Sequence, residues 1–215
     1  MITLLILLAE KGLLPDAIIR LGIRRLCRQR LVDASNINET LMEQEHAAWI
    51  DVLKESPIAL VPEKANEQHY EVPPRLFELV LGDRLKYSSG LWPEGVSSLD
   101  ESEVAMLKLT TDRAGLVDGQ DVLELGCGWG SLTLYMAECF PKSKITAVSN
   151  SNDQRQFIEA RCEERNLKNV EIITADMNDF ETTKLFDRVI SIEMFEHMRN
   201  YEKLLGRVNV WLKNK

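Results

Sequence analysis

The sequence predicts an α/β fold, with a doubly wound parallel sheet over residues 98–215 behind an N-terminal helical cap and substrate-side segment over residues 1–97. Three observations predict it. Apolar runs alternate with helical patterns from Ser98 onward, a glycine-rich turn follows the first apolar run, and the earlier residues form helical patterns that prolines interrupt. Strands joined by helices run parallel through right-handed crossovers, so helices are expected to cover the sheet.

The N-terminal cap begins with a short apolar block, MITLLILLAEKG. The block has no basic flank or small-residue cleavage site and is far too short to span a bilayer, so we expect a buried helix, with a secretion signal as the alternative. Residues 15–31 combine apolar side chains with five arginines. Such a helix either packs one face on its domain or makes peripheral contact with an anionic membrane surface. A third helical pattern covers residues 41–55, before a proline-rich stretch.

The second half contains the expected sheet. A serine followed by acidic residues predicts a helix start at Ser98. After that helix, strands are expected at 121–125, 144–149, 170–174 and 186–192, and helices near 131–140, 152–165 and 200–212.

Composition limits the function classes. The chain has 215 residues, of which 45% are hydrophobic and 28% charged, as in an ordinary globular protein with a core. Its net charge of −8 and its lack of a basic or aromatic array argue against a nucleic-acid partner. The four cysteines show no close pairing, which indicates neither a zinc site nor a disulfide framework. We therefore expect a reducing compartment, the cytoplasm.

The segment DVLELGCGWG at 121–130 is the clearest chemical signal, because Gly126, Gly128 and Gly130 let the backbone turn sharply and approach a ligand. The loop lacks the Gly-Lys-Ser/Thr of a phosphate-binding P-loop, and Ser131 stands where a dinucleotide fingerprint needs glycine. A tight structural turn and half of a nicotinamide-binding oxidoreductase remain as alternatives.

Four motifs occur in order: the run ANEQHYEVPPRLFELVLGDRLKYSSGLW, the GCGWG loop, AVSNSNDQRQFI and SIEMFEHMRNY. Together they resemble the family of cyclopropane-fatty-acyl-phospholipid synthases and plant coclaurine-type N-methyltransferases, over residues of about 65–213. The resemblance implies a Rossmann-like class I methyltransferase sheet and S-adenosyl-L-methionine (SAM) as the cofactor.

The resemblance also assigns cofactor-binding residues. The second strand ends in Ser149 and Asn150 where most class I enzymes have an acidic residue, so Asn150 and Gln154 are expected to contact the cofactor. The Asp176 side chain would accept a hydrogen bond from the exocyclic amine of the adenine, and Met177 would pack against the adenine ring. Asn150 as a cap of the following helix and Asp176 as an ordinary loop residue are the alternatives. The remaining residues implied for cofactor binding are Gly126, Gly128, Gly130, Ser88, Glu124 and Ile192.

Three titratable side chains, Glu193, Glu196 and His197, cluster after the fourth strand. One histidine is too few for the zinc motifs of metallopeptidases, so no metal is expected. Carboxylates can attract the ammonium form of an amine, and a histidine or glutamate can take its proton. Capping of the following helix is the alternative. Tyr87 is expected to lie over the same site.

Two positions favour an amine acceptor over a lipid. Lipid-cyclopropanating members of the family have cysteine and glycine where this chain has Ser89 and Glu193. A phospholipid acyl chain remains the alternative substrate. The class I strand order is 3-2-1-4-5-7-6, and only four strands are expected here, so we expect a chain truncated after an exposed fourth strand, with an incomplete acceptor site. A catalytically silent SAM-binding fragment is a further alternative.

Overall fold

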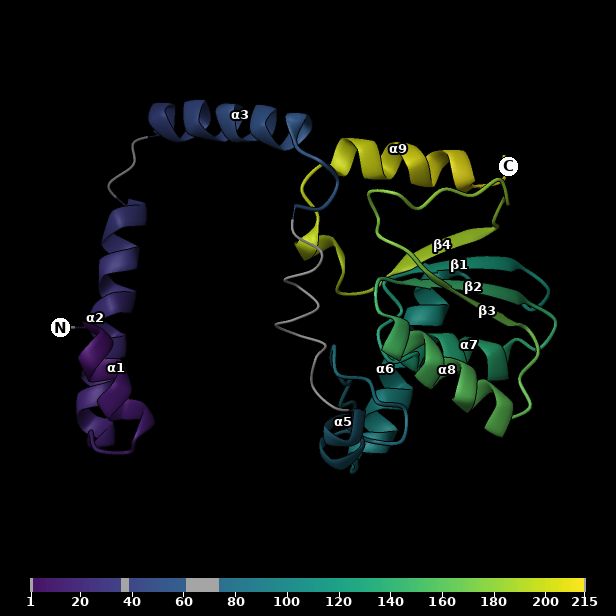
Figure 1. The fold of residues 1–215 in the computed structure, drawn as a ribbon, viewed down its shortest axis with the longest axis horizontal. Helices are drawn as coiled ribbons and strands as arrows, with labels where there is room; N and C mark the ends of the chain where they lie inside the picture. Colours follow the sequence, from purple (N-terminus) through teal and green to yellow (C-terminus); the bar gives the residue numbers. More distant parts are fainter. Residues whose placement is uncertain (1, 36–38, 61–73, 215) are drawn as a thin grey trace. The chain divides into compact units, whose positions relative to one another are not determined.

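The computed structural model describes residues 2–35, 39–60 and 74–214, and contacts divide the chain into a unit of Met1–Val52 and a unit of Leu53–Lys215 (Figure 1). The sequence-based division at 97/98 separates a substrate-side segment from a cofactor domain by function. That functional division remains a prediction.

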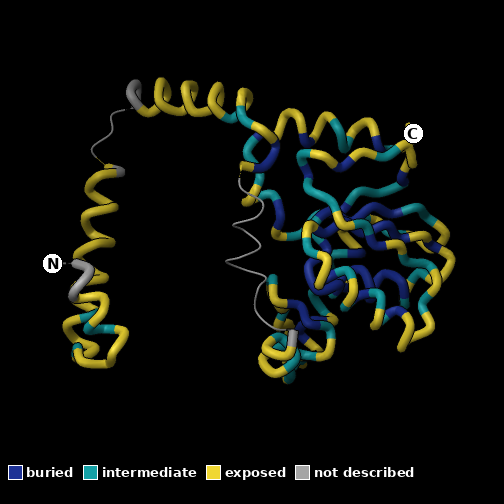
Figure 2. Tube along the Cα trace, in the orientation of Figure 1, coloured by how far each residue is buried: buried dark blue, intermediate teal, exposed yellow. Residues whose placement is uncertain are grey.

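The first unit consists of helix α1 (Ile2–Glu10), helix α2 (Asp16–Ser35) and most of helix α3 (Glu39–Glu55). Nearly all of its described residues are exposed (Figure 2). The expectation of a buried first helix is wrong, because Leu5, Ile6 and Leu7 are 46%, 52% and 48% exposed. The described residues of the unit, 2–35 and 39–52, form no sheet against which an apolar helix face could be buried.

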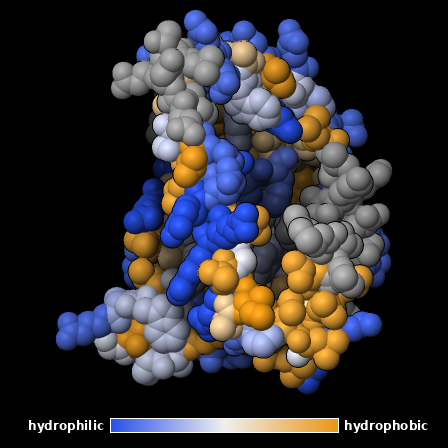
Figure 3. Space-filling model, turned by 90° about the vertical axis from the view of Figure 1, so that its left-hand side faces the viewer, coloured by the Kyte–Doolittle hydropathy of each residue, from blue (hydrophilic) through white to orange (hydrophobic). Residues whose placement is uncertain are grey.

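Helix α2 mixes apolar and basic residues around its circumference. Residues seven apart lie on the same face of a helix, and Arg25 and Arg28 share faces with Ile18 and Leu21. Figure 3 shows hydrophilic and hydrophobic side chains side by side on the surface that it displays. The predicted membrane contact stays a prediction. In the described ranges, no helix has the length and hydropathy needed to cross a bilayer.

The second unit contains a four-stranded, fully parallel sheet, made of β1 (Asp121–Leu125), β2 (Lys144–Ser149), β3 (Val170–Thr174) and β4 (Arg188–Ser191). The strand order is β3-β2-β1-β4. The predicted fold class is therefore confirmed, and so is the central 3-2-1-4 order.

Helices cover both faces of this sheet. Helix α9 (Tyr201–Trp211) lies on one face, and α6 (Leu99–Ala114), α7 (Ser131–Cys139) and α8 (Asn152–Glu164) lie on the other (Figure 1). Alternate strand residues point to opposite faces, so the core has two sides. The cluster facing α9 includes Leu123, Leu125, Val148, Leu204 and Trp211, and the clusters on the other side include Val122, Ile145, Ala147, Met136 and Ile158. The short helix α5 (Pro74–Val80) precedes this layer.

The fourth strand is shorter than the predicted 186–192. Phe186 forms an isolated parallel bridge with Leu212 instead of pairing with β1. At the other end, Glu193 has a φ of 55°, a left-handed conformation that ends the extended strand. The left-handed residue redirects the chain into the 3-10 helix η1 (Phe195–His197) at the carboxyl end of the sheet.

Candidate functional site

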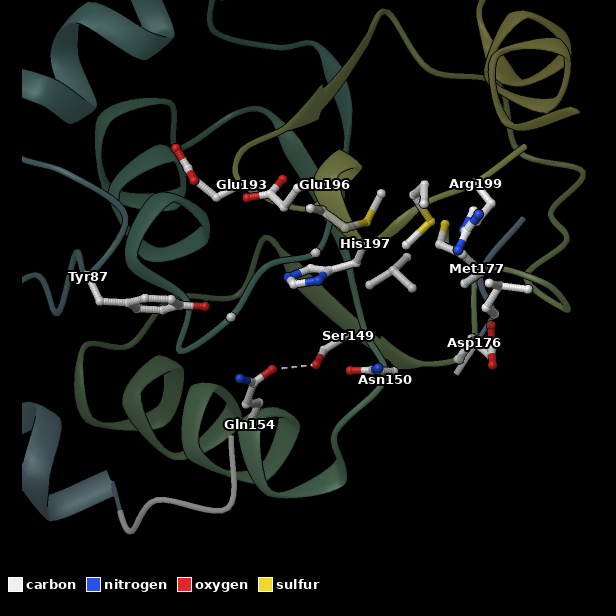
Figure 4. A pocket seen from close by; sticks show the side chains of 18 residues that line it. Tyr87, Ser149, Asn150, Gln154, Asp176, Met177, Glu193, Glu196, His197 and Arg199 are labelled. Atoms are coloured by element: carbon white, nitrogen blue, oxygen red, sulfur yellow. Dashed lines mark hydrogen bonds between the residues drawn. The ribbon is translucent and has the colours of Figure 1, made fainter. Parts of the chain in front are cut away.

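A cavity of about 230 Å³ lies at the carboxyl ends of the four strands (Figure 4). This is the position at which open parallel sheets bind ligands. Each of the loops that follow β1, β2, β3 and β4 contributes to its wall. Ten predicted site residues line it: Tyr87, Gly126, Gly128, Asn150, Gln154, Asp176, Met177, Glu193, Glu196 and His197.

The glycine loop needs its glycines for steric reasons. Gly128 has a φ of 54°, and a Cβ on it would lie 2.7 Å from the Tyr87 Oη. Gly130 has a φ of 81°, and a Cβ there would lie 2.6 Å from Cγ1 of Ile158 in the core. Gly130 does not line the cavity and instead precedes helix α7 as its N-cap. The loop thus combines a glycine that lines the cavity with one that permits close packing.

The end of β2 presents an amide to the cavity. Ser149 Oγ donates to Gln154 Oε1 at 2.6 Å, which fixes a side chain that is only 2% exposed (Figure 4). Gln154 Nε2 is buried and has no hydrogen-bond partner within the protein. A buried donor of this kind calls for a partner. The alternative role of Asn150 as a helix cap is wrong, because Ser151 is the N-cap of α8 and accepts from the Gln154 N–H at 3.4 Å.

The end of β3 places Asp176 and Met177 at the opposite end of the cavity from Tyr87 (Figure 4). Asp176 Oδ1 accepts from the Asn178 N–H at 2.7 Å, so the aspartate also organises its own loop. Met177 is 7% exposed and belongs to the core cluster that faces α9. The loop is therefore well fixed where it meets the cavity.

Glu193, Glu196 and His197 are all solvent-exposed and line the cavity together. In Figure 4 the His197 ring and the Tyr87 side chain extend toward each other, while both glutamates lie on one side of the histidine. These residues do not cap the following helix. Asn200 is the N-cap of α9 and accepts from the Lys203 N–H at 2.9 Å.

Three further predicted residues, Ser88, Glu124 and Ile192, line a smaller cavity of about 40 Å³ that also touches the glycine loop. Glu124 is 3% exposed and accepts from Thr133 Oγ1 at 2.6 Å. Burial raises the pKa of Glu124 to about 7, although the hydrogen bond from Thr133 and the positive charge of Lys86 each act to lower it. The small cavity shares Tyr87, Gly126, Gly128 and Glu193 with the larger one, so the two adjoin.

Lys86 is a residue of this region that the sequence analysis missed. It is 7% exposed, and its Nζ donates to Ser88 Oγ at 2.5 Å. Burial lowers the pKa of Lys86, and the negative charges of Glu193, Glu103 and Glu124 oppose that effect. A single lysine beside a tyrosine carries no distinctive spacing, so only the K-Y-S context could have drawn attention to it.

Ala59 and Leu60 also line the larger cavity, although they lie far from the motifs in sequence. Their apolar side chains follow helix α3 with no pattern that indicates a binding site. Only tertiary contacts bring this segment to the cavity.

Comparisons with known proteins identify a family and relatives of this chain. A family model described as mycolic acid cyclopropane synthetase matches residues 61–215. The (S)-coclaurine N-methyltransferase of Thalictrum flavum subsp. glaucum is 39% identical over 206 residues, which cover 94% of this chain and 56% of that protein. The cyclopropane-fatty-acyl-phospholipid synthase of Escherichia coli (strain K12) is 33% identical over 149 residues, which cover 68% of this chain and 37% of that protein.

Among solved structures, a coclaurine N-methyltransferase bound to N-methylheliamine and SAH superimposes with a TM-score of 0.89 at 38% identity. The match covers 99% of this chain and 61% of that one. The chain thus spans less than two thirds of the length of these relatives.

Proposed function

The chain belongs to the mycolic acid cyclopropane synthetase family, and on that premise we propose that it binds SAM and transfers a methyl group to a small amine. The observation that carries the proposal is the gathering of the glycine loop, Gln154 and the Glu193–His197 group around one cavity. The side chains predicted to bind the cofactor and those predicted to act as acid and base share a single cavity there.

The residues present fit SAM. Gly126 and Gly128 bring the backbone close to the ligand, and the unpartnered Nε2 of Gln154 would donate to an oxygen of the cofactor. Asp176 and Met177 would hold the adenine. Bound SAM would supply an electrophilic methyl group on a positively charged sulfur. The coclaurine N-methyltransferase solved with SAH supports this choice of cofactor.

An amine acceptor would make use of the exposed carboxylates. Glu193 and Glu196 would attract the ammonium form, and His197 or a glutamate would take its proton to free the lone pair. Tyr87 would close the cavity over the reacting groups. Positioning of the acceptor can contribute roughly 7–11 kcal/mol, whereas a general base adds on the order of 10²–10⁴ in rate. Geometry is therefore the larger contribution.

A lipid acyl chain is the second candidate substrate, because a cyclopropane synthase is among the relatives. The greater identity to amine methyltransferases, together with Ser89 and Glu193, favours the amine. A silent cofactor-binding chain is the third candidate, and the methyl-transfer measurement below distinguishes it from the other two. The predicted cytoplasmic location remains a prediction.

Two experiments test the proposal. Calorimetric titration should give heat with SAM and none with NAD, and the reverse result would identify a nicotinamide-binding protein. Transfer of a labelled methyl group should then be measured on a panel of amines and on unsaturated phospholipid. Product with an amine supports the proposal, product with phospholipid alone identifies a lipid enzyme, and SAM binding without any product identifies a silent chain.

A further inference from the structure

Residues 58–60, here called the rim segment, form part of the wall of the larger cavity through Ala59 and Leu60. Ile58 and Ala59 are buried at 3% and 5% exposure, whereas Leu60 is 47% exposed. The segment contacts the loops that follow β3 and β4. Its position depends on hydrogen bonds to residues more than 100 positions later in the chain.

The Asn178 side chain pairs with both backbone polar groups of Ala59. The Ala59 N–H donates to Asn178 Oδ1 at 3.1 Å, and Asn178 Nδ2 donates to the Ala59 carbonyl at 2.9 Å. A carboxamide can donate and accept at once, whereas a carboxylate can only accept and an aliphatic side chain can do neither. Asn178 therefore satisfies both backbone polar groups of a buried residue that lies outside the four-stranded sheet.

The other side of the rim segment is attached to the loop after β4. The Arg199 N–H donates to the Ile58 carbonyl at 2.7 Å, and Ala59 forms an antiparallel bridge with Met198. Met198 and Arg199 line the same cavity. The rim segment thus connects the loop of Asp176 with the loop that carries the acid-base group.

Asn178 is itself held in place. Its N–H donates to Asp176 Oδ1 at 2.7 Å, and its carbonyl accepts from Arg207 Nη1 at 3.0 Å. The same nitrogen of Arg207 donates to the Met177 carbonyl at 3.0 Å. Because Asp176, Met177 and Asn178 are fixed together, a shift of Asn178 would move the rim segment and this end of the cavity as one body.

We propose that Asn178 is a positioning residue that holds the rim segment over the adenine end of the cofactor site, where Leu60 covers the purine ring. The inference rests on the proposed function, which places the adenine beside Asp176 and Met177. A half-exposed leucine at the edge of the cavity would become buried against a bound aromatic ring, and that burial would add to the affinity.

The experiment measures the Kd of the full chain for SAM by calorimetry. Asn178→Ala leaves both backbone groups of Ala59 without their partner, and Leu60→Ala removes the apolar cover without disturbing the backbone. Each variant should raise the Kd by about tenfold. Leu60→Ala alters an exposed side chain, so it tests the proposal even if Asn178→Ala folds poorly.

Two matched controls separate positioning from general loss of stability. Asn169 Nδ2 donates to the carbonyls of Ala137, Phe140 and Ser143, away from the cavity, so Asn169→Ala removes a comparable set of bonds. Leu185 is 52% exposed and lies outside the cavity wall, so Leu185→Ala matches the loss of an exposed leucine. Both controls should keep the Kd of the unmodified chain.

An unchanged Kd in both Asn178→Ala and Leu60→Ala would overturn the inference. So would an equal rise in Kd for Asn169→Ala, because general destabilisation would then explain the effect. Absence of SAM binding by the unmodified chain is a different result, since it would refute the proposed function itself and, with it, the assignment of the rim segment to the cofactor.

Discussion

Glu124 shows how burial of one carboxyl group links the site to stability. Burial raises its pKa from the ordinary value of 4.5 to about 7. Between these two values the folded chain binds one proton more than the unfolded chain does, so stability falls as the pH rises. The stability that the folded protein has while Glu124 is protonated is fully present below pH 4.5. It is lost by about pH 7, where the cost of the buried negative charge reaches about 3 kcal/mol.

We therefore expect Glu124→Gln to become more stable relative to the unmodified chain as the pH rises. The difference in the free energy of unfolding should grow by about 3 kcal/mol between pH 4.5 and 8, because glutamine carries no charge. Urea unfolding of both proteins at several pH values measures it. A difference that stays constant across this range would show that the Glu124 carboxyl does not titrate there in the folded protein.

Helix α6 is the element whose start the sequence predicts best. Ser98 Oγ accepts from the Glu101 N–H at 3.2 Å, and Glu101 Oε2 accepts from the Ser98 N–H at 3.1 Å, which together form a capping box. At the other end, Gly115 adopts a left-handed φ of 59° as the C-cap. Both ends are thus determined by local chemistry.

Ser98→Ala should lower the free energy of unfolding by about 1 kcal/mol, because it leaves an N-terminal N–H of α6 without its acceptor. Thr110→Ala is the matched control in the same helix. Its hydroxyl donates to the Met106 carbonyl four residues earlier, an interaction that adds little to helix stability. Equal losses for the two variants in chemical denaturation would argue against the capping role.

The elements that the sequence predicts well are those that depend on neighbouring residues. The first three strands match their predicted ranges, because each is a short apolar run bounded by turn residues. The rim segment could not be predicted, since Ala59 and Asn178 are 119 positions apart and neither residue has a distinctive pattern. The exposure of α1 was also missed, because an apolar run does not reveal whether a partner surface exists.

At the scale of the whole molecule, the two units differ in how their helices are supported. Core residues of β1 and β2, such as Leu123 and Ala147, are completely buried at 0% exposure. In helix α2, Leu21, Leu26 and Leu31 are about 70% exposed, at 70%, 68% and 70%. A helix whose large apolar side chains are this exposed gains little from packing and depends mainly on its own propensity, which is marginal for 20 residues in water.

Amide hydrogen exchange should therefore separate the two units. The amides of β1 and β2 open only with global unfolding and should exchange at least about a thousandfold more slowly than those of α2, which open by local fraying. Exchange followed by mass spectrometry of peptic fragments measures both in one sample. Dilution of the protein is the control, because self-association would protect α2 in a concentration-dependent way. Protection of α2 equal to that of β1 at every concentration would mean that packing within the chain stabilises this helix, contrary to its exposed side chains.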